Sequence, residues 1–574
     1  MAQIQIQRRD IRKSNELVGV PGILSRILNS RGITNTRQID YALKNLLPPQ
    51  NLSNIDAAVE LLSEAVSANA GIVIVGDFDA DGATSCALAV SCLTAFGASN
   101  VSYLVPNRFE YGYGLSPEIV GVAAMRQPDV IITVDNGISS IDGVHAAQQL
   151  GMSVVITDHH LPGEELPTAD AIVNPNLPRD KFASKALAGV GVIFYVMLAL
   201  RTKLRQQNWF EQEGLSEPNM TQFLDLVALG TVADVVSLDQ NNRLLVQQGL
   251  QNIRQGKARA GILALLAVAN RNPQNIVASD LGFAVGPRLN AAGRLDDMSI
   301  GIECLLADSE EQAMTLARQL DDLNKQRREV EQSMQQDALA IVEQLSLDIS
   351  TQPDVYVLYD ESWHQGVVGL VASRIKERTN RPVFALAPDD TNTQLKGSGR
   401  SVEGVHIRDV LARVDALHPG LIPKFGGHAM AAGLSIDKAN LQKFKLALTT
   451  VVKEMTSNHS WERVLLSDGQ LSDLEFDLSF AEQIKQITPW GQAFPEPLFD
   501  GHFEVVDARI VGETHAKLKL RPIEGQQVLD AICFGYLDQH AELPKGQIRV
   551  AYQLDVNEFR ERKSLQLMIK HIEL

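Results

Sequence analysis

Acidic and histidine residues recur directly after short apolar segments in the first third of the chain. They are Asp77, Asp79 and Asp81, then Asp135, then Asp158, His159 and His160. Carboxylate and imidazole groups without thiolates suit Mn²⁺ or Mg²⁺. There are more such groups than one ion needs, which predicts a two-metal centre. Two ions about 3.5–4 Å apart can hold the attacking and leaving oxygens of a phosphoryl displacement. A single aspartate at such a place more often caps a helix or solvates a turn, but the whole set favours metal.

Five short apolar runs must position these residues. The runs cover 71–75, 101–105, 130–134, 153–157 and 171–173. Each is β-branched and nearly continuous, as is typical of a strand buried on both faces. Helical stretches lie between the runs, and this alternation predicts a parallel, doubly wound α/β sheet. The carboxyl ends of parallel strands meet at one edge, where such folds bind ligands, so the acids and histidines are expected to converge there.

The sheet belongs to the second of five expected parts of the chain. The parts are an N-terminal helical cap (1–50), the α/β domain with a helical extension (51–305), a long linker helix (306–352), a second α/β domain (353–458) and a small C-terminal barrel (459–574). Residues 309–352 contain neither Gly nor Pro, and Ser309 with Gln312 resembles a capping box. We therefore expect one helix, with two helices joined by a polar turn as the alternative.

The two C-terminal parts have different strand patterns. In the second α/β domain, strands are expected at 354–359 and 382–387, and glycine-rich turns at 396–400 and 425–429. The last part has five alternating segments, at 502–511, 515–523, 527–535, 547–556 and 564–574. These segments predict an antiparallel barrel of the OB type.

Composition limits the class of protein. The 574 residues include 52 Lys and Arg against 69 Asp and Glu, a net charge of −17 that does not by itself suggest nucleic-acid binding. The four cysteines are scattered, which excludes a disulfide scaffold or a cysteine zinc cluster. With no secretory signal and no long apolar run, we expect a cytoplasmic protein without a membrane span.

An ordered set of motifs resembles the DHH phosphoesterase superfamily. The motifs are DFDADGATS (77–85), VDNG (134–137), TDHH (157–160), LGTVADVV (229–236), PRLNAAGR (287–294), GSGRS (397–401) and GGHAMAAG (426–433). Together with the linker helix and the barrel, they are similar to the members of the superfamily that degrade single-stranded DNA. The second α/β domain then resembles a DHHA1 domain.

The resemblance implies a metal-dependent 5′→3′ exonuclease that releases 5′-mononucleotides during repair and recombination. By motif match, two Mn²⁺ or Mg²⁺ ions are held by Asp79, Asp81, Asp135, His159 and Asp234, with Asp77 a less certain ligand. Asp135 is the expected bridge between the ions, and His160 contacts the scissile phosphate or orients a ligand. The implied reaction is in-line attack by a metal-activated water.

The remaining motif residues are expected to bind DNA. Arg288, Asn290 and Arg294 are placed at the scissile or adjacent phosphate, with a salt bridge that holds the lobe as the alternative. Ser398 and Arg400, shared with Arg108, are expected to hold the terminal 5′-phosphate and so set polarity. Tyr111 and Tyr113 are expected to stack on bases, although core packing is open. His428 is expected near the DNA backbone, and His364 is interpreted as structural.

The expected partners are single-stranded DNA with a 5′ end, a single-strand-binding protein and a helicase, and the expected state is a monomer associated with the nucleoid. Residues 501–574 are nearly balanced, with 10 Lys and Arg against 11 Asp and Glu, so DNA binding is expected from a locally basic channel. Other readings stay open: a DHH hydrolase of short oligonucleotides, cyclic dinucleotides or pyrophosphate, a non-catalytic scaffold, and RNA as the substrate.

Overall fold

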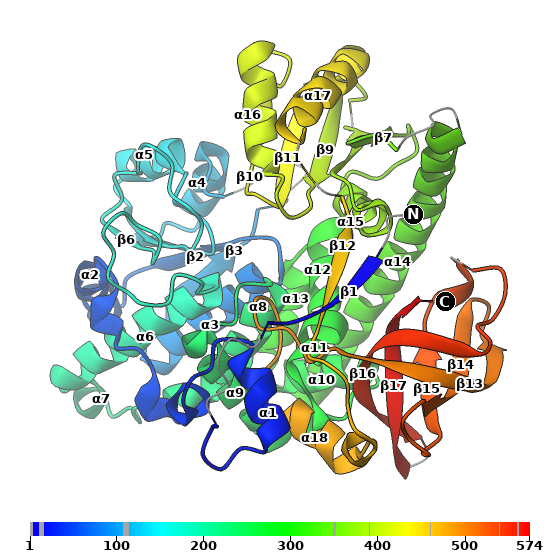
Figure 1. Cartoon of the computed structure of the whole chain (residues 1–574). Coiled ribbons are helices and arrows are strands. Elements are labelled where there is room, and N and C mark those ends of the chain that lie inside the picture. The colour runs from blue at the N-terminus through cyan, green and yellow to red at the C-terminus, as the bar shows by residue number, and fades with distance from the viewer. Residues whose placement is uncertain are drawn as a thin grey trace. The chain divides into compact units, whose positions relative to one another are not determined.

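The chain folds into two compact units in the computed structural model (Figure 1). The structure describes residues 4–10, 16–106, 114–347, 352–389, 391–457, 459, 461–538, 540–559 and 562–573. One unit contains residues 8–324 and 467–574, including all the predicted metal ligands, and is called the metal unit below. The other contains residues 325–466 together with the described residues up to Gln7, and is called the DHHA1 unit after the resemblance of its sequence.

A five-stranded parallel sheet forms the centre of the metal unit. Its strands, in order, are β3 (Val101–Leu104), β2 (Ile72–Gly76), β4 (Val130–Val134), β5 (Ser153–Thr157) and β6 (Ala171–Val173). All four neighbouring pairs are parallel, which confirms the predicted α/β sheet.

The two faces of this sheet are covered by different helices. Ile72 and Ile74 of β2 point into a core shared with α2 (Ile55–Ser67), α3 (Ala80–Ala95) and α6 (Gly189–Gln206). Val73 and Val75 point to the other face and pack with α4 (Pro117–Ala124) and α5 (Ile141–Gln149). This alternation explains why the strands have continuous apolar sequences, since both faces are buried.

A helical extension continues the first core. Its elements are α7 (Trp209–Gln212), α8 (Leu224–Ala233), α9 (Gln240–Arg254), α10 (Ala260–Val268), α11 (Ala278–Asp280), the π-helical turn η6 (Leu281–Val285), α12 (Gly286–Leu295) and α13 (Ser299–Leu306). Of these, α8 packs against α3, and α12 lies against both η6 and α3. The extension therefore adds a second set of helices to the metal end of the sheet.

The N-terminal segment differs from the expected helical cap. Residues Ile4–Arg8 form strand β1, which pairs with β12 (Arg463–Ser467), and the first α-helix is α1 (Gly22–Asn29). The expectation of a helical segment over 1–50 is therefore wrong for Ile4–Arg8. The sequence IQIQR alternates apolar and polar residues, which is the period of a strand and not of a helix. Buried Asp500 accepts hydrogen bonds from Arg8 Nε and Nη2 at 2.9 and 3.1 Å.

The linker is one continuous helix, α14 (Glu310–Leu347), which belongs to the metal unit up to Asn324 and to the DHHA1 unit from Lys325. At its start, Ser309 Oγ accepts a hydrogen bond from the Gln312 amide at 3.2 Å, as the capping pattern predicted. One helix is confirmed over Glu310–Leu347, and the alternative of two helices is wrong there. The expected range of 306–352 is too long at its start, where Leu306 ends α13, and residues 348–351 lie outside the described residues.

The DHHA1 unit contains a mixed sheet. Its strand order is β10 (Lys424–Gly427), β11 (Ala431–Asp437), β9 (Gln394–Arg400), β8 (Val383–Pro388) and β7 (Tyr356–Tyr359). Besides the second part of α14, this unit contains the α-helices α15 (Val368–Thr379), α16 (Ile407–Leu417) and α17 (Leu441–Met455). The expected glycine-rich turns are largely strand instead. Glycine is needed in β9 because a Cβ at Gly399 would lie 2.6 Å from Phe384 Cε1.

The C-terminal strands close into a barrel, as predicted. The order is β13 (Phe499–Val511), β14 (His515–Pro522), β15 (Leu529–Cys533), β17 (Arg562–Glu573) and β16 (Gln547–Phe559), with α18 (Leu478–Ile487) packed against β16 and β17. The barrel is not wholly antiparallel, because β15 and β17 are parallel. Among the described residues, the structure has no helix that is both long and apolar enough to cross a membrane.

Candidate metal centre

The first acidic motif lies in the turn from β2 into α3. Asp79 is the N-cap residue of α3, and its Oδ1 accepts hydrogen bonds from the amides of Asp81 and Gly82 at 2.9 and 3.1 Å. A Cβ at residue 82 would lie 2.3 Å from the carbonyl oxygen of Asp77, so this tight turn requires glycine. Asp77 and Asp81 are buried in the same turn.

Asp81 is held by the start of α6. Its Oδ2 accepts a hydrogen bond from the Gly189 amide at 2.6 Å, and its Oδ1 accepts one from the Val190 amide at 2.9 Å. Burial, together with the charge of Asp79, raises the pKa of Asp81 to about 7. The helix N-terminus therefore fixes this carboxylate in place, while burial still disfavours its charge.

Asp135 lies at the end of β4 in a backbone conformation that is unusual for its residue type. Its φ is +61°, and its amide donates to the Thr157 carbonyl of β5 at 3.0 Å. A Cβ at Gly189 would lie 2.5 Å from the Asp135 Cβ, so α6 approaches this residue closely. Burial and the charges of Asp81, Asp79, Asp234 and Asp77 raise the pKa of Asp135 well above its usual value.

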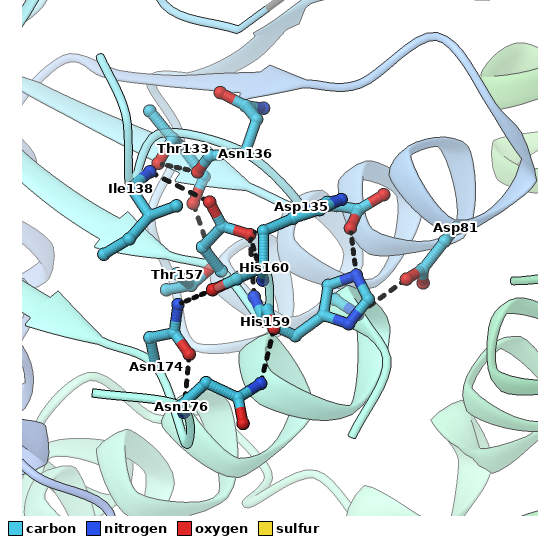
Figure 2. A network of polar contacts seen from close by, with 12 residues as sticks. Asp81, Thr133, Asp135, Asn136, Ile138, Thr157, His159, His160, Asn174 and Asn176 are labelled. Atoms are coloured by element: carbon cyan, nitrogen blue, oxygen red, sulfur yellow. Dashed lines mark hydrogen bonds and ion pairs between the residues drawn. The ribbon is translucent and has the colours of Figure 1, made fainter. Parts of the chain in front are cut away.

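His159 joins the end of β5 to the end of α8. Its Nε2 lies 3.0 Å from Asp135 Oδ1 (Figure 2). The same nitrogen lies 3.6 Å from Oδ2 of Asp234, the residue that ends α8. Burial and the charges of Asp81, Asp79 and Asp77 raise the pKa of Asp234 well above its usual value. The acidic residues and the imidazole thus meet at one edge of the sheet, as the sequence predicted.

The loop after β5 is fixed by a buried carboxylate. Asp158 Oδ1 accepts hydrogen bonds from the His159 amide at 2.7 Å, the His160 amide at 3.0 Å and His160 Nδ1 at 2.7 Å. Burial opposes charge on both partners, but their hydrogen bond and mutual attraction lower the pKa of Asp158 and raise that of His160 to about 9. His160 is therefore expected to be cationic at neutral pH.

Two asparagines complete the support of this loop. Asn174 Nδ2 donates to the His160 carbonyl at 2.8 Å, and Asn176 Nδ2 donates to the His159 carbonyl at 2.6 Å (Figure 2). Asn174 Oδ1 accepts from the Asn176 amide at 2.8 Å, so the residues that follow β6 form one clamp on the loop. Behind them, Asn136 Nδ2 donates to the carbonyls of Val75 and Val134 at 3.0 and 2.9 Å, which joins the ends of β2 and β4.

The donor set fits a pair of divalent cations. In each of three groups, the possible ligand atoms lie within 4.8 Å of one another; the groups are Asp77, Asp79 and Asp135; Asp135, His159 and His160; and Asp81, His159 and Asp234. Asp135 and His159 each belong to two groups, which suits ligands shared between neighbouring ions. Burial, and after it mutual repulsion, raises the pKa values of Asp81, Asp135 and Asp234, and bound cations would offset both effects.

The arginines and the asparagine predicted to bind phosphate have different surroundings. Asn290 Oδ1 accepts a hydrogen bond from the Ala80 amide at 2.7 Å, so this side chain caps the start of α3. Arg288 is buried, and its Nη2 lies 2.7 Å from Asp321 Oδ1 of α14. This ion pair is the alternative that the sequence left open for the motif. Arg294 is half-buried on the last turn of α12.

The residues of the predicted 5′-phosphate pocket are partly described. Arg400 Nη1 donates to Ser398 Oγ at 2.7 Å, and a Cβ at Gly369 would lie 2.9 Å from Arg400 Nη2 and 3.1 Å from Ser398 Oγ. Both side chains therefore face the first turn of α15. His428 is exposed between β10 and β11. Arg108, Tyr111 and Tyr113 lie outside the described residues.

Sequence reasoning placed Asp158, Asn174 and Asn176 at this edge of the sheet, because each follows one of its strands. It did not predict that they support the histidine loop. Gly189 and Val190 carried no positional signal, because they act through backbone amides at a helix start far along the chain.

Three family models match successive parts of the chain. They are the DHH family N-terminal domain over residues 71–231, the DHHA1 domain over residues 352–454 and the RecJ OB domain over residues 467–571. Their order confirms the predicted succession of α/β sheet, second α/β domain and OB-type barrel.

Relatives match over nearly the full length. The single-stranded-DNA-specific exonuclease RecJ of Escherichia coli is 52% identical over 573 residues, with 99% of each chain covered. The protein of the same name from Haemophilus influenzae is 50% identical over 571 residues, again with 99% of each chain covered. A crystal structure of RecJ from Thermus thermophilus in complex with Mn²⁺ is 28% identical with a TM-score of 0.80, and covers 100% of this chain and 79% of the other. On these grounds, the chain belongs to the RecJ family of DHH phosphoesterases.

Proposed function

We propose that this chain is a metal-dependent exonuclease that hydrolyses single-stranded DNA from its 5′ end to 5′-mononucleotides, in DNA repair and recombination. The observation that carries the proposal is the set of overlapping ligand groups at the carboxyl edge of the first sheet. Full-length relatives are named as single-stranded-DNA-specific exonucleases, and RecJ from Thermus thermophilus has been crystallised with Mn²⁺ and with Mg²⁺.

The side chains of the centre have different proposed roles. Asp77, Asp79, Asp81, Asp135, His159 and Asp234 would hold two Mn²⁺ or Mg²⁺ ions, with Asp135 shared. Bound there, the cations supply Lewis-acid charge for phosphodiester hydrolysis. The His160 imidazolium is fixed by Asp158 at 2.7 Å and carries a positive charge, which suits contact with a phosphate oxygen.

The DHHA1 unit supplies a candidate anion pocket. The guanidinium of Arg400, the hydroxyl of Ser398 and the start of the twelve-residue helix α15 lie together. A fixed guanidinium beside a helix N-terminus favours a phosphate. A pocket for the terminal 5′-phosphate would make the enzyme begin at the 5′ end, and Arg108 is a further proposed member.

The remaining proposed contacts concern DNA and partner proteins. Arg288, Asn290, Arg294 and His428 are proposed to position the strand backbone, and Tyr111 and Tyr113 to stack on bases. We further propose a monomer that acts at the nucleoid in the cytoplasm, where a helicase and a single-strand-binding protein handle the same strands.

A doubly labelled substrate tests this function. A 5′-phosphorylated single strand carries different labels at its two ends and is incubated with Mn²⁺ or with Mg²⁺. We expect early release of mononucleotide from the 5′ label only. Asp135→Asn should abolish release and weaken Mn²⁺ uptake measured by calorimetry. Internal cuts, early release from the 3′ label or full activity of Asp135→Asn would contradict the proposal.

A further inference from the structure

Two apolar side chains are exposed to solvent on segments next to the end of α8, the helix that ends at the ligand candidate Asp234. Val235 directly follows the ligand candidate Asp234 and is 62% exposed, and Phe283 in the turn η6 is 81% exposed. A phenylalanine in water forgoes the burial that usually stabilises it, and an aromatic residue at this exposure is uncommon on a protein surface.

Both residues lie in unusual backbone. Val235 has a φ of +62°, in the left-handed region that β-branched residues rarely adopt and that glycine usually occupies after a helix. Leu281–Val285 is a π-helical turn, and such turns are rare and occur frequently at functional sites. Fold stability alone does not favour a valine or a π-turn at these places.

The turn that carries Phe283 packs against the helix α8, which ends at the ligand candidate Asp234. A Cβ at Gly282 would lie 3.1 Å from Val232 Cγ1, and one at Gly286 would lie 3.1 Å from the Ala233 Cβ, so η6 lies against the last turn of α8. That turn of α8 ends at Asp234. After η6, the chain continues into α12, whose Asn290 binds the Ala80 amide at the start of α3. The helices α3, α8 and α12 can be followed in Figure 1.

We propose that Phe283 and Val235 form an apolar surface on which a nucleobase of the single strand lies next to the scissile phosphate. This inference rests on the proposed function. A base is flat and apolar on its faces, and stacking on an aromatic ring does not depend on base identity. An enzyme that removes every nucleotide in turn needs contacts of this kind. Such a contact also selects for unpaired strands, because in a duplex the base faces are already stacked.

Removing the bases from the substrate tests the inference directly. The rate of nucleotide release is measured against concentration for a 5′-phosphorylated thymidine strand and for the same strand with abasic 5′-terminal positions. Wild type should lose about 5- to 100-fold in kcat/KM on the abasic strand, mainly through KM. On the intact strand, the kcat/KM of Phe283→Ala should be lower than that of wild type by a similar factor. On the abasic strand, the kcat/KM of this variant should be little lower than on the intact one. Phe283→Trp should restore the preference for bases.

Matched variants distinguish the contribution of the exposed side chains from general effects of a substitution. Val235→Gly keeps a residue suited to positive φ, so any loss in kcat/KM reports the missing side chain. Leu150→Ala is the control, because Leu150 is 59% exposed but lies between α5 and the start of β5, at the opposite edge of the sheet. Leu150→Ala should match wild type on both strands.

The possible failures have different signatures. If wild type degrades both strands equally, or if Phe283→Ala retains the full preference for bases, the stacking surface is disproved and exonuclease activity stands. Unchanged DNA kinetics in Phe283→Ala would leave a protein partner as the occupant of this surface. If wild type releases no nucleotide from either strand, the proposed function itself fails.

Discussion

Asp158 organises the histidines and is itself absent from the groups of possible metal ligands. Its carboxylate accepts hydrogen bonds from both histidine amides and from His160 Nδ1, and its other oxygen accepts from the Ile138 amide at 2.9 Å. A carboxylate behind a metal-site histidine fixes the ring and its protonation. Within the triplet at 158–160, Asp158 is therefore the positioning residue, and both histidines belong to groups of possible metal ligands.

Asn176→Ala tests the importance of the clamp on this loop. The variant removes the 2.6 Å hydrogen bond to the His159 carbonyl, and the loop then gains freedom next to a ligand. Changes to residues that support metal ligands typically cost about 10- to 100-fold in activity or metal affinity, and we expect a loss in this range. Gln148→Ala is the matched control, because Gln148 Nε2 also donates to a backbone carbonyl, that of Thr168 at 2.7 Å. Equal activities in the two variants would show that the clamp has no catalytic importance.

The pH dependence of the metal-free protein follows from the raised carboxyl pKa values. A carboxyl whose pKa is higher in the folded state binds protons more tightly there, so stability falls as pH rises from the unfolded value towards the folded one. For Asp81 this window runs from 3.8 to about 7. We expect the melting temperature of the metal-free protein to decrease as pH rises between about pH 4 and pH 7, and Mn²⁺ to restore it. Calorimetry should also find Mn²⁺ affinity rising over this range, and a flat profile would contradict the assignment.

The ligand candidates could be predicted from sequence because each acid or histidine directly follows an apolar strand or lies in a recognisable motif. The residues that hold them are less accessible to such reasoning. Gly189 contributes an amide to Asp81 and closely approaches Asp135, yet nothing in its local sequence indicates which side chains it meets. The charge of Arg288 suggested a contact with phosphate. Its ion pair with Asp321 could not be predicted, because Asp321 lies on another helix and nothing in the local sequence joins the two residues.

Among the elements, α14 joins the two units without a break. Lys325→Pro should interrupt it where the units divide, since proline removes a backbone hydrogen bond and clashes with the preceding turn, at a cost of about 3 kcal/mol. We expect degradation of long single strands to fall about 100-fold, because catalysis is sensitive to small displacements of substrate. Mn²⁺ uptake should persist, because all ligand candidates lie in the metal unit.

The control for this variant is Lys325→Ala, which removes the same exposed side chain and keeps the helix. It should degrade DNA at the wild-type rate. If Lys325→Pro also did so, continuity of α14 would have no role in acting on polymeric DNA.

Helices and strands could be predicted where the local residue pattern matches the structure that the segment adopts in the folded protein. The strands of the first sheet and the capped start of α14 are such cases. Strand β9 is a case of disagreement, because its sequence QLKGSGR has the composition of a turn. Gly397 and Gly399 serve packing there, since a Cβ at either would collide with Leu434 or Phe384, and that requirement becomes visible only in the folded sheet.

At the scale of the whole molecule, contacts join segments that are far apart in sequence. Leu24 and Ile27 of α1 share a core with the barrel strands, and Arg31 binds Asp468 at 2.7 Å. Sequence patterns predicted the order of the domains but not these contacts, because a long-range contact leaves no local periodicity. The N-terminal residues were therefore read as a separate cap.

The net charge of −17 requires that DNA be held by local groups of basic residues. On the barrel, exposed Arg509 of β13 is the cross-strand partner of Lys517 of β14, so two cations lie side by side.

If both cations bind phosphates, the double variant Arg509→Ala with Lys517→Ala should reduce the slope of log affinity against log salt concentration by about 1.4. Each phosphate contact to a single strand contributes about 0.7 to this slope. The slope is measured by fluorescence anisotropy on a labelled single strand. Lys545→Ala is the control, because Lys545 is 82% exposed and lies 3.8 Å from Glu542. An unchanged slope in the double variant would place the phosphate contacts elsewhere on the molecule.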